Sequence, residues 1–152
     1  MRRAVLLALT LVACAAAPTA AQDEAPPDPS IADGSAQRDL DAARAAWKAG
    51  GLMSYRWRIA RGCFCPEPYT RARNVTVRGG VPSKRTANEV REFATVTRLF
   101  RIVQSAIDRK VAVLTVSYDA RLGYPRRVWI DVSPMIADEE TSYRASRLTR
   151  LR

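Results

Sequence analysis

Residues 111–132, VAVLTVSYDARLGYPRRVWIDV, contain the clearest strand pattern in this chain, and the predicted fold is built around them. Apolar and polar residues alternate with a period of two on both sides of a polar break that contains Asp119, Gly123 and Pro125. This pattern is typical of two antiparallel strands. The break is longer than a two-residue turn, so we expect a wider loop, and Pro125, which has no amide hydrogen, suits the first residue of the second strand.

Further strands are expected on either side of this hairpin. Residues 55–61 alternate cleanly, with Tyr55, Trp57 and Ile59 on one face and Arg56 and Arg58 on the other. A strand is also predicted over residues 73–78, followed by the hairpin signal Gly79-Gly80 and a short return strand over residues 81–85. A final strand is predicted over residues 141–151, although its poor alternation is also compatible with a helix at the end of the chain.

Two segments have helical periodicity. Residues 35–49 begin at Ser35, end before Gly50-Gly51 and place Leu40, Ala43 and Trp47 on one stripe. A second helix is predicted to begin at a capping box formed by Thr86 and Glu89. Its buried stripe comprises Phe93, Val96, Phe100, Val103 and Ile107. The predicted fold class is therefore α+β: an antiparallel sheet of five to six strands covered by one long amphipathic helix, plus a short N-terminal helix.

The N-terminus has the composition of an export signal. Arg2 and Arg3 precede an apolar run over residues 4–13 that is too short to span a bilayer. Residues 11–14 resemble a lipobox, which would make Cys14 a lipidated N-terminus, and residues 19–21 alternatively fit ordinary signal peptidase. We expect a signal peptide over 1–21 (or 1–13 in a lipoprotein), a disordered linker over 22–34 and a single domain over 35–152, located in the periplasm or anchored in the bacterial envelope.

The composition restricts the chemistry available to the chain. There is no histidine among 152 residues, which removes the commonest general base and the commonest zinc ligand. The formal charge is +10, and 22 of the 25 basic residues are arginine. Because these arginines are scattered, they form either a solvated surface or an anion-binding face. No nucleic-acid motif is visible, so no nucleic-acid partner is expected, and no catalytic residue, cofactor or metal is expected either.

Cys63 and Cys65 flank Phe64 and precede Pro66 and Pro68. An oxidising compartment favours a structural disulfide between Cys63 and Cys65, which would close a very small ring. A disulfide between two protein molecules is a second interpretation. A redox-active pair is the alternative, although redox folds usually show C-x-x-C at the start of a helix. Two cysteines without histidine are too few ligands for a zinc site.

Trp129 is predicted to lie on the face of its strand opposite Val128 and Ile130, beside Arg127 and Asp131. An exposed aromatic residue next to charged side chains is typical of a ligand or partner surface. The alternative is that the N-terminal helix covers it through Trp47. Arg127, Trp129 and Asp131 are therefore candidate binding residues.

A set of short motifs, in order, resembles an uncharacterised family of bacterial secreted proteins and lipoproteins, domain of unknown function 6174. The resemblance extends over about residues 43–148. It implies an envelope location and a compact α+β domain, and it carries no activity or catalytic residue. The residues that carry it are Trp47, Tyr55, residues 63–66, 75–81, Leu99, Phe100, Tyr118, Asp119, residues 123–125, Ile130, Asp131 and residues 138–140.

These observations favour a non-enzymatic envelope protein, a small binding or interaction module whose partner is an envelope protein or a small ligand. Contact with the membrane is expected only through an N-terminal lipid anchor, in the case where Cys14 is lipidated. Two other function classes stay open: a thiol-disulfide protein that uses Cys63 and Cys65, and an inhibitor of an envelope enzyme that presents the loop over residues 63–68.

Overall fold

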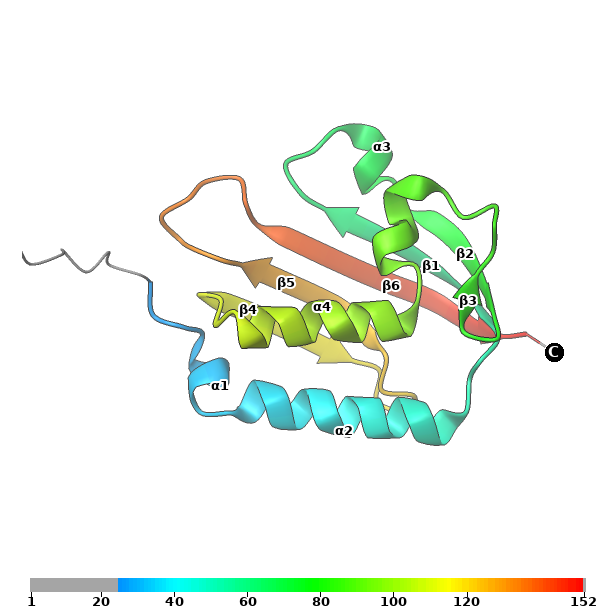
Figure 1. The fold of residues 1–152 in the computed structure, drawn as a ribbon, viewed down its shortest axis with the longest axis horizontal. Coiled ribbons are helices and arrows are strands. Elements are labelled where there is room, and N and C mark those ends of the chain that lie inside the picture. Colours follow the sequence, from blue (N-terminus) through cyan, green and yellow to red (C-terminus); the bar gives the residue numbers. More distant parts are fainter. Residues whose placement is uncertain (1–24, 152) are drawn as a thin grey trace, which may run out of the picture.

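The computed structural model describes residues 25–151, which form one antiparallel sheet of six strands and five helices (Figure 1). This confirms the α+β class and the upper limit of the predicted strand number. The helices are α1 (Pro29–Ala32), α2 (Ser35–Gly50), α3 (Glu67–Thr70), the 3-10 helix η1 (Asn88–Phe93) and α4 (Val96–Asp108). The strands are β1 (Tyr55–Gly62), β2 (Arg73–Arg78), β3 (Val81–Pro82), β4 (Val113–Tyr118), β5 (Pro125–Asp131) and β6 (Thr141–Arg150).

The sheet has the strand order β3-β2-β1-β6-β5-β4, so the last strand of the chain lies in its middle and joins two smaller antiparallel groups. The predicted central hairpin is confirmed: β4 pairs with β5, with Val116 opposite Val128. Pro125 is the first residue of β5. Gly123, in the connecting loop, has a φ of +75°, a left-handed conformation that glycine adopts without strain.

The poor alternation of the final strand has a physical cause. The pairing of β6 with β1 shifts register between Arg56 and Arg58, which is a β-bulge, and Arg147 of β6 has a φ of +53°. Before the bulge, Tyr143 and Ala145 face the core, and after it Leu148 does so. A strict period of two is therefore interrupted, although the segment is a strand throughout.

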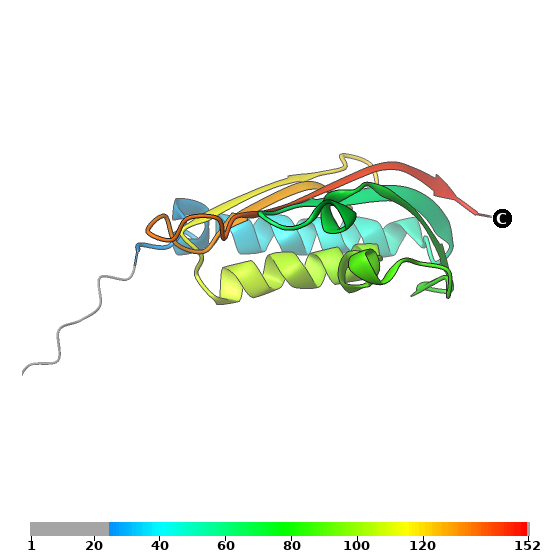
Figure 2. The same cartoon turned by 90° about the horizontal axis from the view of Figure 1, so that it is seen from above.

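Helices α2 and α4 both lie on the same face of the sheet (Figure 2). Leu40 and Ala43 of α2, and Val96, Phe100 and Val103 of α4, are buried against the strands, as their spacing predicts. The structure does not confirm a single long covering helix, because α2 is the longer of the two and α4 spans 13 residues. One layer of helices thus covers one face of the sheet.

The predicted capping box at Thr86 is wrong. Residues 88–93 form η1 without a side-chain cap, and α4 begins only at Val96. The Thr95 Oγ1 accepts a hydrogen bond from the Arg98 amide at 3.2 Å, and the Tyr55 hydroxyl accepts one from the Val96 amide at 2.9 Å. A cap from the neighbouring residue and a second acceptor from β1 therefore fix the start of the helix.

The fold includes residues before the predicted domain start. The Asp28 amide donates to the Val111 carbonyl at 2.9 Å, and the Asp28 carboxylate accepts from the Leu114 amide at 2.8 Å. Asp28 also caps α1, which falls within the predicted linker over residues 22–34. These bonds attach the N-terminal segment to the outer edge of β4. The predicted signal segment and Cys14 lie outside the described residues.

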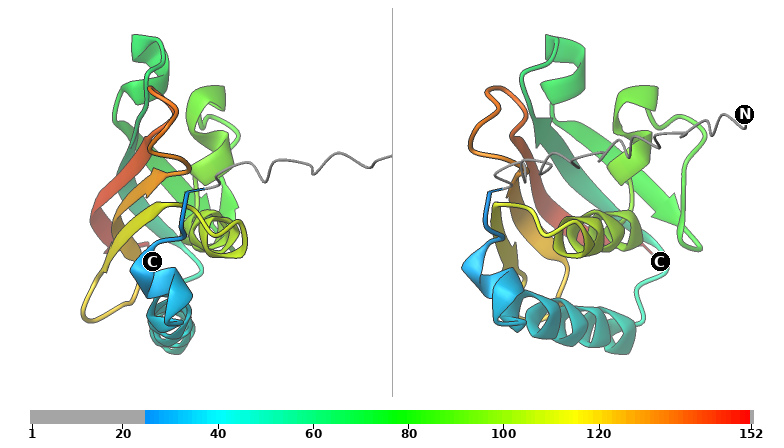
Figure 3. Two further views of the ribbon diagram at one scale, coloured as in Figure 1. Left: turned by 90° about the vertical axis from the view of Figure 1, so that its left-hand side faces the viewer. Right: turned by 60° about the vertical axis from the view of Figure 1, so that its left-hand side comes forward.

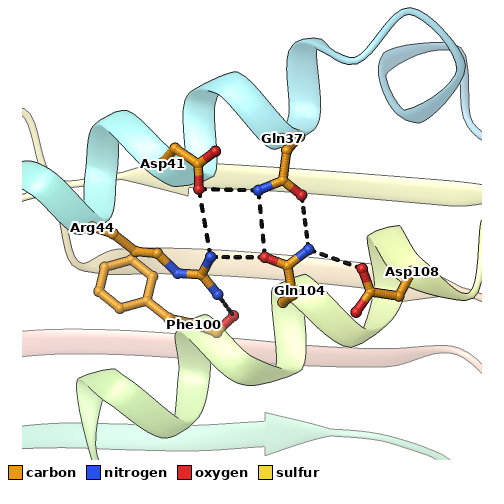
Figure 4. Close-up of polar contacts among 6 residues, drawn as sticks. All are labelled: Gln37, Asp41, Arg44, Phe100, Gln104 and Asp108. Atoms are coloured by element: carbon orange, nitrogen blue, oxygen red, sulfur yellow. Dashed lines mark hydrogen bonds and ion pairs between the residues drawn. The ribbon is translucent and has the colours of Figure 1, made fainter.

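A polar network joins α2 to α4 (Figure 4). Gln104 of α4 donates to Gln37 at 2.7 Å and to Asp108 at 2.9 Å, and it accepts from Arg44 at 2.7 Å. Arg44 is also 3.5 Å from Asp41. Because each of these side chains has a partner on a neighbouring turn or on the other helix, the two helices are held as one layer.

Candidate binding surface on the open face of the sheet

The face of the sheet opposite the helices is not covered by any other element of residues 25–151 (Figure 2). Successive side chains of a strand point to opposite faces of the sheet. The core residues of β5 and β6 therefore face the helices, and Arg127, Trp129 and Arg144 lie on the open face. On β1 the same alternation places Arg56 and Arg58 there. Arginine is thus the main basic component of this surface.

The strand register brings these arginines close together. Arg127 of β5 is directly opposite Arg144 of β6. Arg144 is in turn opposite Ala60 of β1, two residues from Arg58. Directly opposite residues have Cβ atoms about 5 Å apart and diagonal neighbours about 7–8 Å apart. Arg127, Arg144 and Arg58 therefore form a diagonal row across three strands, and Arg56 lies next along β1.

This row, Arg127–Arg144–Arg58–Arg56, has no carboxylate partner among residues 25–151. The ion pairs in the described part of the chain are Arg44–Asp41, Arg61–Glu92 and Arg71–Glu67, and none involves the row. Adjacent like charges repel one another and raise the positive potential of the surface above them. A guanidinium presents donors in a fork that matches carboxylate and phosphate groups, so the row favours an anionic partner.

Trp129 lies beside the row and is 46% exposed. A shallow groove of about 270 Å³ runs past it; the groove is lined by Thr115, Ser117, Arg127, Trp129, Ser142 and Arg144, with Val128 and Tyr143 at its base. The alternative in which Trp47 covers Trp129 does not occur, since the Trp47 ring lies on the helical side of the sheet, 5.4 Å from Tyr55 and 6.4 Å from Tyr124. The exposed indole therefore stands next to unpaired guanidinium groups.

Of the three predicted surface residues, the fold brings Arg127 and Trp129 together in the groove. Asp131 is at the end of β5, on the same face but outside the groove lining, and its Oδ1 is buried without a hydrogen-bond partner among the described residues. Sequence reasoning missed Arg144 and the serines around it. The period-two spacing of these residues in β6 could have indicated that they share one face of a strand. Only the strand order of the folded sheet places β6 next to β5.

Cys63 and Cys65 lie in the loop between β1 and α3. Their sulfur atoms are at disulfide distance and their Cα atoms are 5.3 Å apart. The Cys65 amide donates to the Cys63 carbonyl at 2.9 Å, so the three residues make a tight turn. Phe64, at its apex, is almost entirely exposed.

A second hollow, of about 230 Å³, lies between α2 and β4 and is lined in part by Ser30, Asp39 and Tyr118. Burial raises the pKa of the Tyr118 hydroxyl, and the nearby Asp39 carboxylate raises it further. The phenol therefore stays protonated at neutral pH and is a poor general base. Within residues 25–151, no three cysteine or acidic side chains are grouped closely enough to hold a metal ion.

These features define a class: a small α+β protein with one helical layer and an arginine-rich open sheet face. The chain belongs to a family described as a family of unknown function, DUF6174, whose model matches residues 39–150. This confirms the family resemblance. Neither the curated proteins nor the solved structures contain a match to the chain.

Proposed function

We propose that this protein is a non-enzymatic interaction module of the bacterial cell envelope, and that the open face of its sheet binds an acidic segment of an envelope protein. The observation that carries the proposal is the row of four arginines beside the exposed Trp129, which have no carboxylate partner in the described part of the chain. Arginine and tryptophan are the residue types that contribute most binding energy at protein interfaces.

The shape of the surface favours a protein partner over a small molecule. Small-molecule sites are usually concave, with volumes of about 300–1,000 Å³, and enclose most of the ligand. The groove beside Trp129 is smaller, about 270 Å³, and lies on an open sheet. An extended acidic segment can cross several strands and contact the whole row, whereas a small ligand contacts one or two guanidinium groups.

The test is the binding of a fluorescent poly-glutamate peptide. We expect the double variant Arg127→Glu/Arg144→Glu to bind about tenfold or more weakly than the unchanged protein, because it replaces two attractive charges by repulsive ones. The matched control is Arg85→Glu/Arg101→Glu, which changes the net charge equally. Both control residues are exposed and lie outside the open face.

Equal losses in the two double variants would show that only net charge matters and would contradict a site on the open face. Failure of the unchanged protein to bind the peptide would contradict an acidic partner altogether. Crosslinking from intact envelopes through a photoreactive group at position 129 then identifies the partner, with the same group at position 101 as the control.

The envelope location is part of the proposal and rests on the composition of residues 1–21. Two processing products are possible, and the intact mass of the native protein separates them. A lipidated product begins at Cys14 and carries acyl mass, whereas a soluble product begins at Gln22. No helix in the described part of the chain is long and apolar enough to cross a bilayer.

A further inference from the structure

Large apolar side chains are exposed at one end of the sheet, in two loops. Phe64, in the β1–α3 loop, is 82% exposed, and Met135 and Ile136, in the β5–β6 loop, are 83% and 57% exposed. Exposed apolar groups of this size, gathered at loop tips, mark an interaction site more often than a solvated surface.

The topology places the two loops side by side. Gly62, at the end of β1, is opposite Ser142 of β6, and Ile130, near the end of β5, is opposite Thr141 of β6. Since β6 lies between them, the ends of β1 and β5 are about 10 Å apart. Both loops project from the same end of the sheet in two different views (Figures 1 and 3).

The local structure holds Phe64 outward. It is the middle residue of the tight turn closed by the Cys65–Cys63 backbone hydrogen bond, and the sulfur atoms on either side of it are at disulfide distance. In the other loop, the Glu139 carboxylate accepts a hydrogen bond from the Ser133 amide, which turns this acid back toward the loop backbone. The apolar side chains are thus left at the tips.

The described chain enters the fold at this same end. Asp28 is bonded to Val111 and Leu114, and the neighbouring Val113 is opposite Asp131 at the end of β5. If Cys14 carries lipid, the ten residues between it and Ala25 let the two lie at most about 40 Å apart. The opposite end of the sheet is farther away by the length of β6, about 33 Å for its ten residues. The end of the sheet that carries Phe64, Met135 and Ile136 is therefore the end nearest to such an anchor.

We infer that Phe64, Met135 and Ile136 form a membrane-docking tip, which inserts into the interface of the lipid bilayer. Charges of both signs lie beside the two loops: Arg109 and Glu139 line the same hollow, and Arg61 is 4.0 Å from Glu92. Insertion therefore depends on burial of apolar area more than on anionic lipid. The site differs from the open face, so this inference does not depend on the proposed protein partner; it rests on the envelope location proposed above.

The experiment measures partition of the exported Cys14→Ser protein, which cannot be lipidated, into vesicles of phosphatidylethanolamine and phosphatidylglycerol. The tip variant is Phe64→Ser/Met135→Ser. The control is Met53→Ser/Val81→Ser, because Met53 and Val81 are 62% and 65% exposed and lie at the opposite end of the sheet.

We expect the tip variant to lose partition by on the order of tenfold or more, from the usual free energy of burying one apolar side chain, and the control to keep it. Partition should change little when phosphatidylglycerol is replaced by phosphatidylcholine. Equal partition of the two variants, or no partition of the parent protein, would overturn the inference. Sedimentation equilibrium tests the alternative that the tip is a contact between two copies of the protein. If the parent and the control are dimers and the tip variant is a monomer, the tip is such a contact, and the membrane inference is overturned.

Discussion

Arg127 on β5 and Arg144 on β6 are directly opposite one another on neighbouring strands, on the same face of the sheet, and neither has an ion-pair partner within residues 25–151. Like charges in directly opposite positions destabilise a sheet. A protein that keeps this arrangement loses some folding free energy at a surface position where many neutral residues would fit.

Replacing Arg144 by glutamine should therefore stabilise the unliganded protein. We expect the free energy of unfolding to rise by about 0.2–1 kcal/mol at low ionic strength, because one of the two facing charges is removed. The gain should shrink as salt is added. Urea unfolding measures it. Arg78→Gln is the control, since Arg78 is opposite Val81, and a loss of stability in Arg144→Gln would show that the pair is not repulsive.

Tyr55 supports the start of α4, so Tyr55→Phe should destabilise the protein at neutral pH. The substitution leaves the buried Val96 amide without its acceptor, and an unsatisfied buried donor costs about 1–3 kcal/mol. Urea unfolding with the exposed Tyr69→Phe as control measures the loss. A change near zero would show that another group accepts this hydrogen bond.

The same residue contributes a pH dependence in alkaline solution. Burial raises the pKa of Tyr55 from 10.0 to about 12. The folded state therefore favours the neutral phenol, and this contribution to stability is complete below pH 10 and is lost as pH rises through 12. We expect the stability of the wild type to fall more steeply over this interval than that of Tyr55→Phe, and parallel curves would contradict the assignment.

Gly123 should not tolerate a side chain, because the loop before β5 lies against the backbone of α2. A Cβ atom at this position would be 2.2 Å from the Ala43 carbonyl oxygen, and φ is +75°. Gly79 has a φ of +55° with no atom within 4 Å of its Cβ position, so Gly79→Ala measures the conformational cost alone. That cost is about 1–2 kcal/mol. We expect Gly123→Ala to lose clearly more in a chemical denaturation experiment, and equal losses would show that the loop moves aside.

The double variant Cys63→Ser/Cys65→Ser should still fold. The ring that the pair would close is very small, so the loop-closure model gives a stabilisation of only about 1–2 kcal/mol. We expect a modest fall in melting temperature. Titration of the pair against glutathione buffers distinguishes the thiol-disulfide alternative: a reduction potential of roughly −120 to −200 mV, together with a thiolate that reacts rapidly near neutral pH, would favour a redox function.

Elements with a local residue pattern could be predicted from the amino-acid sequence alone. The alternation in residues 111–132 and 55–61 predicts β4, β5 and β1, and the stripe through Leu40 and Ala43 predicts α2. These predictions are confirmed because period-two and helical repeats follow from which side of a strand or helix is buried. The bulge in β6 was not predictable in this way, because it depends on the register between β6 and β1. The start of α4 was not predictable either, because it depends on a hydrogen bond to the Tyr55 hydroxyl.

The candidate surfaces depend on tertiary structure to a greater degree. The sequence places Arg127 and Trp129 on one face of a strand, but only the position of β6 between β1 and β5 brings Arg144 and Arg58 beside them. The same strand order puts the loop that contains Phe64 beside the loop that contains Met135, although these two residues are far apart in the sequence. The alternation of apolar and polar residues can be read within a single strand. Which strands become neighbours depends on how the whole sheet packs against α2 and α4.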